Sequence, residues 1–377
     1  MNDPDDSSVT GSLLNRLCNS YAPRRLELAS TLMNPLTSIS VDGRHVKECS
    51  YEQRPLGADE VAIRVRAVGI CRTDLYVMDG TIPAQRPVIP GHEFAGVVVE
   101  TGSHVKRLKR GDRVAVNPII PCGECGFCRA DNRADCQHTS MLGVDRDGAC
   151  CSVAIVPGRA AFLVPDSLSF EEAAFAEPVA ACLAVTRSGI ERTQVGLIVG
   201  ENRIARLTER ILLAHGFSDV SICAPEGLAD VSDCEFDFAI ETHATTEVLS
   251  QLIRVIRPRG RIVLKSRQYR PVELTLRDLL PKEPVLQAVN YGRFDEAVAL
   301  LVDRRVDVSD LIGQRFAFSD LRLPSVRLGA KTLERRSLFL TRRFDGVWNF
   351  RRPSAITHQR NAGQKHATDA RPPGTGW

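Results

Sequence analysis

The sequence has no long apolar run and no recognisable secretory leader. None of its 377 residues belongs to a stretch of about 18 consecutive apolar residues, which is the length a helix needs to cross a bilayer. The first residues also lack the basic segment followed by an apolar segment that marks a secretory signal. These absences argue against a membrane-spanning protein and predict a protein of the cytoplasm.

Net charge is also small, but it is unevenly distributed along the chain. Lys and Arg number 49 against 46 Asp and Glu, so the formal net charge is +3. From Arg322 onward, twelve Lys or Arg residues stand against three Asp or Glu, so this end carries about +9 and the remainder about −6. A basic end of this kind could contact nucleic acid or acidic partners, but we expect a solvated tail.

Cysteine, in contrast, is abundant. The chain has twelve cysteines, and four of them fall within one 15-residue segment, at Cys122, Cys125, Cys128 and Cys136. In a reducing compartment such a cluster favours metal ligation over a disulfide framework. The glycines that follow the first two cysteines let the backbone turn tightly, and four thiolates favour a Zn²⁺ ion that is closed to substrate. The spacing therefore predicts a structural zinc site.

A second group of residues that commonly bind metals is spread more widely along the chain. Cys71 lies in the segment GICRTD, His92 follows twenty-one residues later, and Glu177 precedes a proline much further on. One thiolate, one imidazole and one carboxylate can hold a zinc ion that keeps an open position for substrate. Taken singly, a histidine is more often a satisfied core residue, and a glutamate before proline is more often a charge at a helix start.

Short apolar runs divide the chain into two kinds of region, and its length and 43% hydrophobic content suffice for two cores. Residues 61–68 alternate apolar and charged side chains, which predicts a half-buried strand. With further β-rich runs at 94–99 and 113–116, this favours an antiparallel barrel. After residue 171 helices and strands alternate, which predicts an α/β region with a mostly parallel sheet. Its predicted strands are 195–199, 220–223, 236–240 and 261–264, and its predicted helices are 173–187, 203–215 and 247–256.

Several motifs occur together in an order that is typical of one family. GICRTD, PGHEFAGVVVETG, KRGDRV, the four-cysteine loop and AEPVA all lie within residues 55–185. Through them the chain resembles the zinc-dependent medium-chain dehydrogenases/reductases, such as the alcohol, polyol and threonine dehydrogenases. The resemblance implies an α/β fold with a GroES-like antiparallel β-barrel catalytic domain and a Rossmann-type parallel-sheet domain. It also implies that Cys71 and His92 bind a catalytic zinc ion, with Glu93 or Glu177 completing the ligand shell.

The same resemblance implies supporting roles in catalysis. Thr73 matches the hydroxyl that begins the family's proton relay, although capping of a turn would be its plainer role. Asp74 matches the carboxylate that orients His92. Glu93 counts among the catalytic residues because it can exchange on the metal. Tyr76 stands where some members carry a relay histidine.

The nucleotide-binding half resembles the family less closely. The expected G-x-G-x-x-G begins at Gly200, but Asn202 replaces its second glycine and Ala205 its third. Asn202 can adopt a positive φ, yet it adds a side chain where a cofactor would pack. Ala224 stands where an acid would hold the ribose hydroxyls, so the choice between NAD and NADP is not predicted. About a dozen residues separate Ala224 from the next strand, too few for a crossover helix and a further strand, which predicts a shortened domain.

The end of the chain departs from the family. An amphipathic helix over residues 291–306 is expected to return the chain to the barrel. Beyond residue 320 the family's closing helix and strand are expected to be absent. The predicted order is an extension (1–32), the GroES-like zinc-binding catalytic domain (33–185), a Rossmann-like nucleotide-binding domain (186–290), a return to the catalytic domain (291–320) and a divergent basic tail (321–377).

Three functions compete on this evidence. The first is hydride transfer between a secondary alcohol, such as a polyol, sugar or amino alcohol, and NAD or NADP, with two zinc ions per chain. The second is a zinc-binding member of the family that has lost cofactor binding and acts as a non-catalytic binding or regulatory protein. The third, which we expect least, is nucleic-acid binding through the basic tail. The resemblance further implies a homodimer or a homotetramer.

Overall fold

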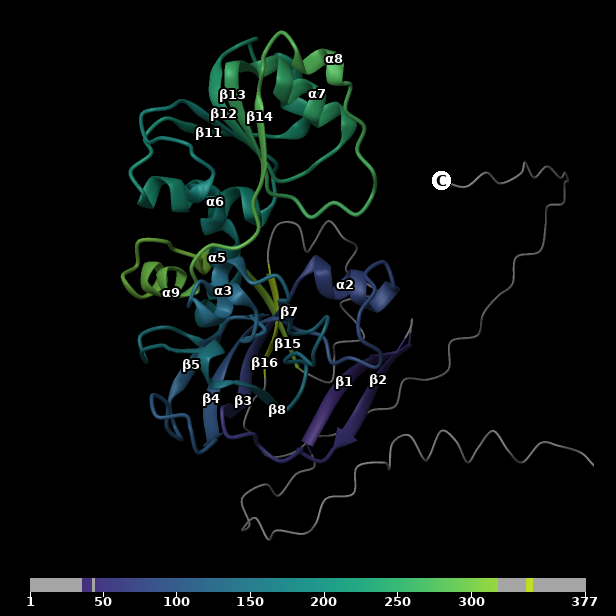
Figure 1. Cartoon of the computed structure of the whole chain (residues 1–377), viewed down its shortest axis with the longest axis vertical. Coiled ribbons are helices and arrows are strands. Elements are labelled where there is room, and N and C mark those ends of the chain that lie inside the picture. Colours follow the sequence, from purple (N-terminus) through teal and green to yellow (C-terminus); the bar gives the residue numbers. More distant parts are fainter. Residues whose placement is uncertain (1–35, 43–44, 318–336, 342–377) are drawn as a thin grey trace, which may run out of the picture. The chain divides into compact units, whose positions relative to one another are not determined.

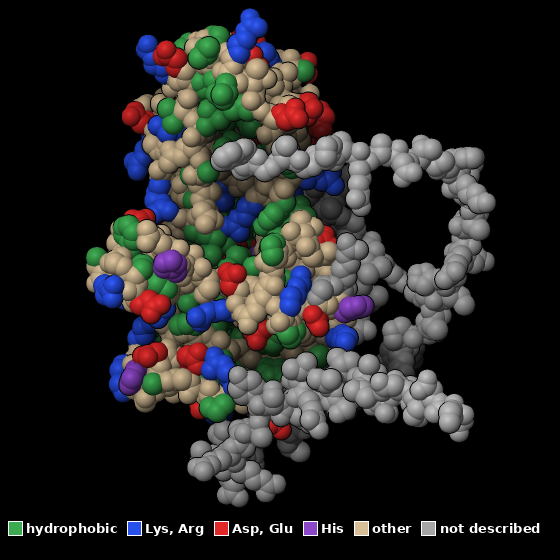
Figure 2. Space-filling view, turned by 45° about the vertical axis from the view of Figure 1, so that its right-hand side comes forward, with side chains coloured by type: hydrophobic (Ala, Val, Ile, Leu, Met, Phe, Trp, Pro, Cys, Tyr) green, Lys and Arg blue, Asp and Glu red, His purple; other side chains and the backbone are tan. Residues whose placement is uncertain are grey.

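The computed structural model describes residues 36–42, 45–317 and 337–341. The predicted extension and most of the predicted basic tail lie outside these residues. The nucleic-acid hypothesis depends on that tail, so it also falls outside the described part of the chain. No helix in the part of the chain that is described is long and apolar enough to cross a membrane. On the face seen in Figure 2, the basic and acidic side chains of that part are intermixed.

The first region is built on a mainly antiparallel sheet of seven strands (Figure 1). Its central strand, β3 (Glu60–Ile70), pairs antiparallel with β4 (Glu93–Thr101) and β8 (Val153–Pro157). The valines and isoleucines of β3 are buried and its two arginines are partly exposed, as the alternating pattern predicts. The other strands of this sheet are β5 (Arg113–Val116), β9 (Ala161–Leu163), β15 (Ile312–Ala317) and β16 (Ser337–Thr341). Two smaller sheets have two strands each: β1 (Leu36–Asp42) with β2 (His45–Tyr51), and β6 (Ile119–Ile120) with β7 (Ser140–Met141).

The prediction that the family's closing strand is absent after residue 320 is wrong. β16 lies between β15 and β3, parallel to the former and antiparallel to the latter. Phe339 in this strand is fully buried, with its ring centroid 5.7 Å from that of Phe175. A five-residue segment with three apolar residues suffices for a strand when both neighbours supply main-chain hydrogen bonds. Basic residues flank it on both sides, so its short apolar run gave little signal in the sequence.

The second region is a parallel sheet of five strands in the order β11-β10-β12-β13-β14 (Figure 1). All four predicted strands form, and β14 extends the sheet beyond β13. The connection from β11 to β12 holds only the 3₁₀ helix η4 (Pro225–Asp230), and β11 is an edge strand. The expected α/β class and the shortened parallel sheet are therefore confirmed. The strands are β10 (Gly196–Val199), β11 (Val220–Cys223), β12 (Phe236–Glu241), β13 (Ile256–Leu264) and β14 (Val285–Ala288).

The helices differ in detail from those expected. The predicted helix 173–187 is divided into three elements. The first break, after Ala174, has its cause in Pro178, which lacks an N–H and whose ring would clash with the Ala174 carbonyl four residues earlier. The predicted helix 291–306 spans only Phe294–Val302, and Arg304, just beyond it, has a positive φ of 56°. The principal helices are α2 (Arg72–Asp79), α3 (Gly126–Arg129), α4 (Phe170–Ala174), α5 (Ala176–Leu183), α6 (Arg203–Ala214), α7 (Thr246–Val255), α8 (Leu276–Leu279) and α9 (Phe294–Val302), and η3 (Ala184–Arg187) and η5 (Ser309–Leu311) are 3₁₀ helices. The boundaries between the predicted domains stay a prediction.

Candidate metal centres and catalytic pocket

The four clustered cysteines converge on one point. Their sulfur atoms all lie within 4.8 Å of one another, and Cys122 Sγ is 3.9 Å from Cys128 Sγ and 3.5 Å from Cys136 Sγ. These separations are too long for disulfides, whereas a tetrahedral zinc with bonds of about 2.3 Å spaces its sulfurs by about 3.8 Å. Backbone N–H groups of Cys125 and Cys128 donate to the sulfurs of Cys122 and Cys125. Such bonds favour thiolates, so the loop fits the predicted structural zinc.

A second cluster unites Cys71, His92 and Glu93. Cys71 is the N-cap of α2, His92 immediately precedes β4, and Glu93 begins that strand. One ligand atom from each lies within 4.8 Å of the others. The β3–β4 register pairs Gly69 with Glu93, and a Cβ at Gly69 would come within 2.5 Å of Glu93 Oε2. The glycine of the GICRTD motif thus makes room for the carboxylate.

Asp74 ties two of these residues together. Its Oδ1 lies 3.1 Å from His92 Nδ1, and its Oδ2 accepts a hydrogen bond of 2.8 Å from the Cys71 backbone N–H. Burial alone would raise the pKa of Asp74, but attraction to His92 and the hydrogen bonds it accepts hold that pKa below its ordinary value. A charged Asp74 therefore leaves Nε2 of the imidazole to face the metal position, and the orienting role expected from the resemblance stays a prediction.

Glu177 lies near this cluster but does not join it. Its side chain is buried at the start of α5 and accepts a short hydrogen bond from the Tyr291 hydroxyl. Burial raises the pKa of Glu177 above its ordinary value, and the neighbouring charge of Glu93 adds to the effect. Of the two carboxylates left open by the sequence, Glu93 is the one within ligand distance of Cys71 and His92.

Arg203, which sequence reasoning missed, reaches the same cluster from the first turn of α6. Its guanidinium contacts both oxygens of Glu93, with Nη2–Oε1 at 2.5 Å and Nη1–Oε2 at 3.0 Å. Arg203 is 5% exposed and Glu93 is 1% exposed, so the pair is buried. Burial opposes the charge of Arg203, but Glu93 more than compensates and raises its pKa. The two partners are 110 positions apart in the sequence, so no local sequence pattern indicated their contact.

The phosphate loop has a geometry that differs from the expected one at Asn202. Gly200 has a φ of 140°, and a Cβ there would collide with Thr242, so this glycine is required. Asn202 does not use the expected positive φ: it is the N-cap of α6 with a φ of −96°, an extended conformation that suits a capping residue. Its Oδ1 accepts from the N–H groups of Ile204 and Ala205, both at 3.0 Å. The helix N-terminus is thus capped by its own side chain.

The other two residues predicted for the cofactor site, Ala205 and Ala224, are both described by the structure, and their cofactor roles stay predictions. Ala205 is fully buried in the first turn of α6, where a small residue lets the helix pack closely on the sheet. Ala224 follows the last residue of β11 and caps the 3₁₀ helix η4 without a side-chain hydrogen bond. No ribose-binding carboxylate therefore stands at this position.

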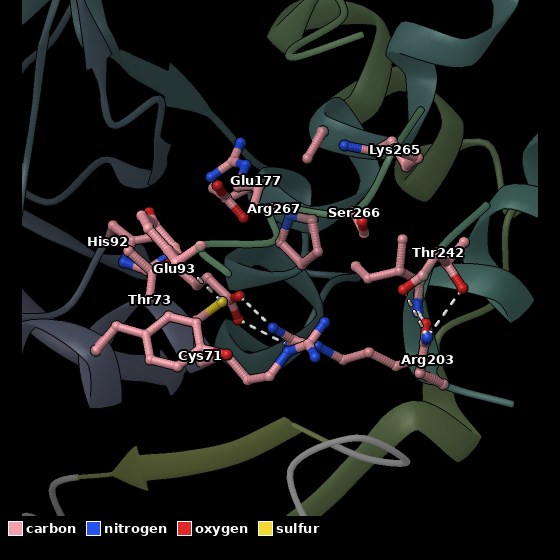
Figure 3. A pocket seen from close by; sticks show the side chains of 17 residues that line it. Cys71, Thr73, His92, Glu93, Glu177, Arg203, Thr242, Lys265, Ser266 and Arg267 are labelled. Carbon is pink, nitrogen blue, oxygen red and sulfur yellow. Dashed lines mark hydrogen bonds and ion pairs between the residues drawn. The ribbon is translucent and has the colours of Figure 1, made fainter. Parts of the chain in front are cut away.

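One pocket joins the metal cluster to the phosphate loop (Figure 3). Thr73, which is 7% exposed, lines it and lies 3.9 Å from the Cys71 sulfur through its hydroxyl. Tyr76 also lines it and packs edge-on against the Tyr269 ring, at a centroid distance of 5.2 Å. Sequence reasoning missed the side of the pocket that follows β13, which contributes Lys265, Ser266, Arg267 and Tyr269.

Comparison with known proteins agrees with this architecture. The family model of the alcohol dehydrogenase GroES-like domain matches residues 57–166. An L-threonine 3-dehydrogenase of Marinomonas sp. (strain MWYL1) is 33% identical over 201 residues, which are 51% of this chain and 56% of that protein. A 2-dehydro-3-deoxy-L-galactonate 5-dehydrogenase of Pseudoalteromonas atlantica is 27% identical over 296 residues, 70% of this chain and 86% of that protein.

Solved structures extend the similarity to the whole fold. The crystal structure of 2R,3R-butanediol dehydrogenase from Bacillus subtilis superimposes with a TM-score of 0.72 at 23% identity. The match covers 82% of this chain and 100% of that one. At this level of identity the likeness concerns the fold.

Proposed function

We propose a function on one premise: this chain belongs to the zinc-dependent medium-chain dehydrogenase/reductase family. The proposed reaction is reversible hydride transfer between a secondary alcohol and NAD or NADP. Its substrate is a small hydroxyl compound of the polyol, sugar or amino-alcohol kind. The observation that carries the proposal is the convergence of Cys71, His92 and Glu93 in a pocket that also reaches the phosphate loop.

The donor sets fit two zinc ions of different character. Cys71, His92 and Glu93 would hold the catalytic ion, because three protein ligands leave one tetrahedral position open. When bound there, zinc lowers the pKa of an alcohol and polarises the corresponding carbonyl. The four cysteines of residues 122–136 would hold the second ion with a complete set of thiolates, which excludes substrate and supports the loop.

The chain's own residues hold this site in position and move its proton. Asp74 fixes both the imidazole of His92 and the backbone of Cys71. Thr73 presents a hydroxyl beside Cys71 in the pocket, where it can accept the proton that leaves the substrate alcohol. Arg203 offsets the charge of the buried Glu93.

The family's dinucleotide-binding loop has small residues at three positions, and this chain keeps a small residue at two of them. Gly200 provides the tight turn and Ala205 the close helix packing. Asn202 fits less well, because its amide already occupies the N–H groups that a pyrophosphate would use. A dinucleotide held by these residues would supply the hydride acceptor. Without a carboxylate at Ala224, neither NAD nor NADP is assigned.

Activity measured on protein loaded with zinc tests the proposal. We expect NAD(P)H to form, followed by absorbance at about 340 nm, when secondary alcohols are supplied with either cofactor. Cys71→Ser should abolish this activity while circular dichroism stays unchanged and the four-cysteine zinc is retained. Full activity in Cys71→Ser would contradict the proposed site.

The comparisons give the non-catalytic alternative no support, since the similar proteins are named as dehydrogenases. The homodimer or homotetramer and the cytoplasmic location stay predictions.

A further inference from the structure

The pocket beside the metal ligands is rich in cationic side chains. Four Lys or Arg residues line it, against two carboxylates. Arg203 is engaged by Glu93, as described above. The other three cations, Arg72, Lys265 and Arg267, have no carboxylate oxygen within 4.0 Å among the residues that the structure describes. These three are called the cationic wall below.

Lys265 is the buried member of the cationic wall. It follows β13, and its side chain is 5% exposed. Within the described residues, its ammonium makes one long hydrogen bond, 3.4 Å to the carbonyl of Asn290. An ammonium group has three donors, and a buried cation that leaves donors unused is destabilising. Burial accordingly lowers the pKa of Lys265. An anion entering the pocket would supply the missing partner.

Arg267 stands at the exposed mouth of the same pocket and is held in place from one side. Its guanidinium carbon lies 4.7 Å from the centroid of the Tyr291 ring, and Nη2 donates to Asn290 Oδ1 at 3.1 Å. This stacking fixes the plane of the guanidinium but uses few of its five donors. Figure 3 shows Arg267 beside Glu177, on the side of the pocket that faces His92.

The two cations differ in their distance from the phosphate loop. Lys265 lies between Glu177 and Cys182, whose thiol donates to the Ile204 carbonyl in the first turn of α6, so it is close to the loop. Arg267 lies beside Glu177 and Tyr291, on the side of the metal ligands. A cofactor pyrophosphate would be held at the helix start. Arg267 is on the side of the metal ligands, so the anion that it meets, together with Lys265, is expected to belong to the molecule that approaches those ligands.

We propose that the substrate of this site carries an anionic group, a carboxylate or a phosphate, which Lys265 and Arg267 bind while its hydroxyl faces Cys71 and His92. The inference rests on the proposed function and narrows its substrate to hydroxy acids or phosphorylated polyols. One buried and one exposed cation lining the pocket would both attract such a substrate and orient it, whereas a neutral polyol would leave Lys265 without an anionic partner.

Matched pairs of neutral and anionic ligands test this on the zinc-loaded wild-type protein. Calorimetric titration would compare galactitol with galactitol 1-phosphate, and sorbitol with gluconate. We expect at least one anionic member to bind about 10-fold or more tightly than its neutral partner, with a gap that narrows as salt is added. The ligand pair with the larger difference in affinity shows whether the anionic group is a phosphate or a carboxylate. Equal affinity within both pairs overturns the proposal.

Variants then assign the effect to the two cations. Lys265→Met and Arg267→Met should each weaken the preferred anionic ligand by about 10- to 100-fold, the loss of one charge-assisted hydrogen bond, and the neutral ligand by less than about 3-fold. Lys109→Met, at an exposed lysine far from the pocket lining, is the matched control. Equal weakening of both members of a pair, or weakening of NADPH binding alone, refutes the assignment. Tight anion binding that both variants weaken, without any NAD(P)-dependent oxidation, would instead contradict the proposed function and leave Lys265 and Arg267 as an anion-binding site only.

Discussion

Replacing Arg203 with methionine should destabilise the metal-free protein strongly, because Glu93 would be left as a buried carboxylate without its cation. The two contacts of 2.5 and 3.0 Å join side chains that are almost fully buried. Breaking a pair of this kind costs about 3–5 kcal/mol, whereas an exposed pair is worth about 0–1 kcal/mol. At about 1–2 °C for each kcal/mol in a protein of 377 residues, the melting temperature should fall by about 3–10 °C.

A double-mutant cycle isolates the pair from other effects of the change. Arg203→Met, Glu93→Gln and the double variant would be unfolded in urea after removal of metal with a chelator. We expect the double variant to recover much of the lost free energy, with a coupling of about 2 kcal/mol or more. Arg54→Met, which breaks the exposed pair with Glu60, is the control and should cost at most about 1 kcal/mol. A cost below about 1 kcal/mol for Arg203→Met, or a coupling energy near zero, would show that the buried Arg203–Glu93 pair does not stabilise the metal-free protein as proposed.

Three further predictions concern pH, metal and cofactor. Burial raises the pKa of Glu241 from 4.5 to about 7, so the free energy of unfolding should fall as pH rises from about 4.5 to about 7. Glu241→Gln should remove this pH dependence and add up to about 3 kcal/mol of stability at pH 8. An unchanged pH dependence in urea titrations of the variant would contradict this. Elemental analysis should find two zinc ions per chain and one in Cys71→Ser, whereas loss of both or of neither would argue against separate sites. Asn202→Gly should free two N–H groups of α6 and tighten NADH binding by up to about 10-fold in a fluorescence titration, and weaker binding would show that the amide helps the cofactor.

The metal ligands were predictable because their signals are local or follow a familiar order. The four cysteines of one loop need only a few glycine-assisted turns to meet, and Cys71 and His92 lie at the ends of strands that pair directly. The shortened crossover after Ala224 could likewise be read from chain length alone, because a dozen residues cannot hold a helix and a strand.

Contacts between distant segments were not predictable in the same way. Arg203 meets Glu93 across 110 residues, and nothing in the composition around either residue signals the partner. Lys265 is of interest because its side chain is buried. The sequence shows only a lysine after an apolar strand and does not reveal that burial. Asn202 was expected to accept a positive φ in the glycine's place, but an asparagine before a helix is also a good cap, and capping prevailed.

Titration of the zinc-loaded protein with NADH and NADPH, followed through nicotinamide fluorescence, decides whether this chain can bind the cofactor that hydride transfer requires. We predict a saturable signal with at least one of the two cofactors, because the parallel sheet and the turn at Gly200 still form the site in which a nicotinamide would reach the metal ligands. The absence of a saturable signal with both cofactors would contradict it.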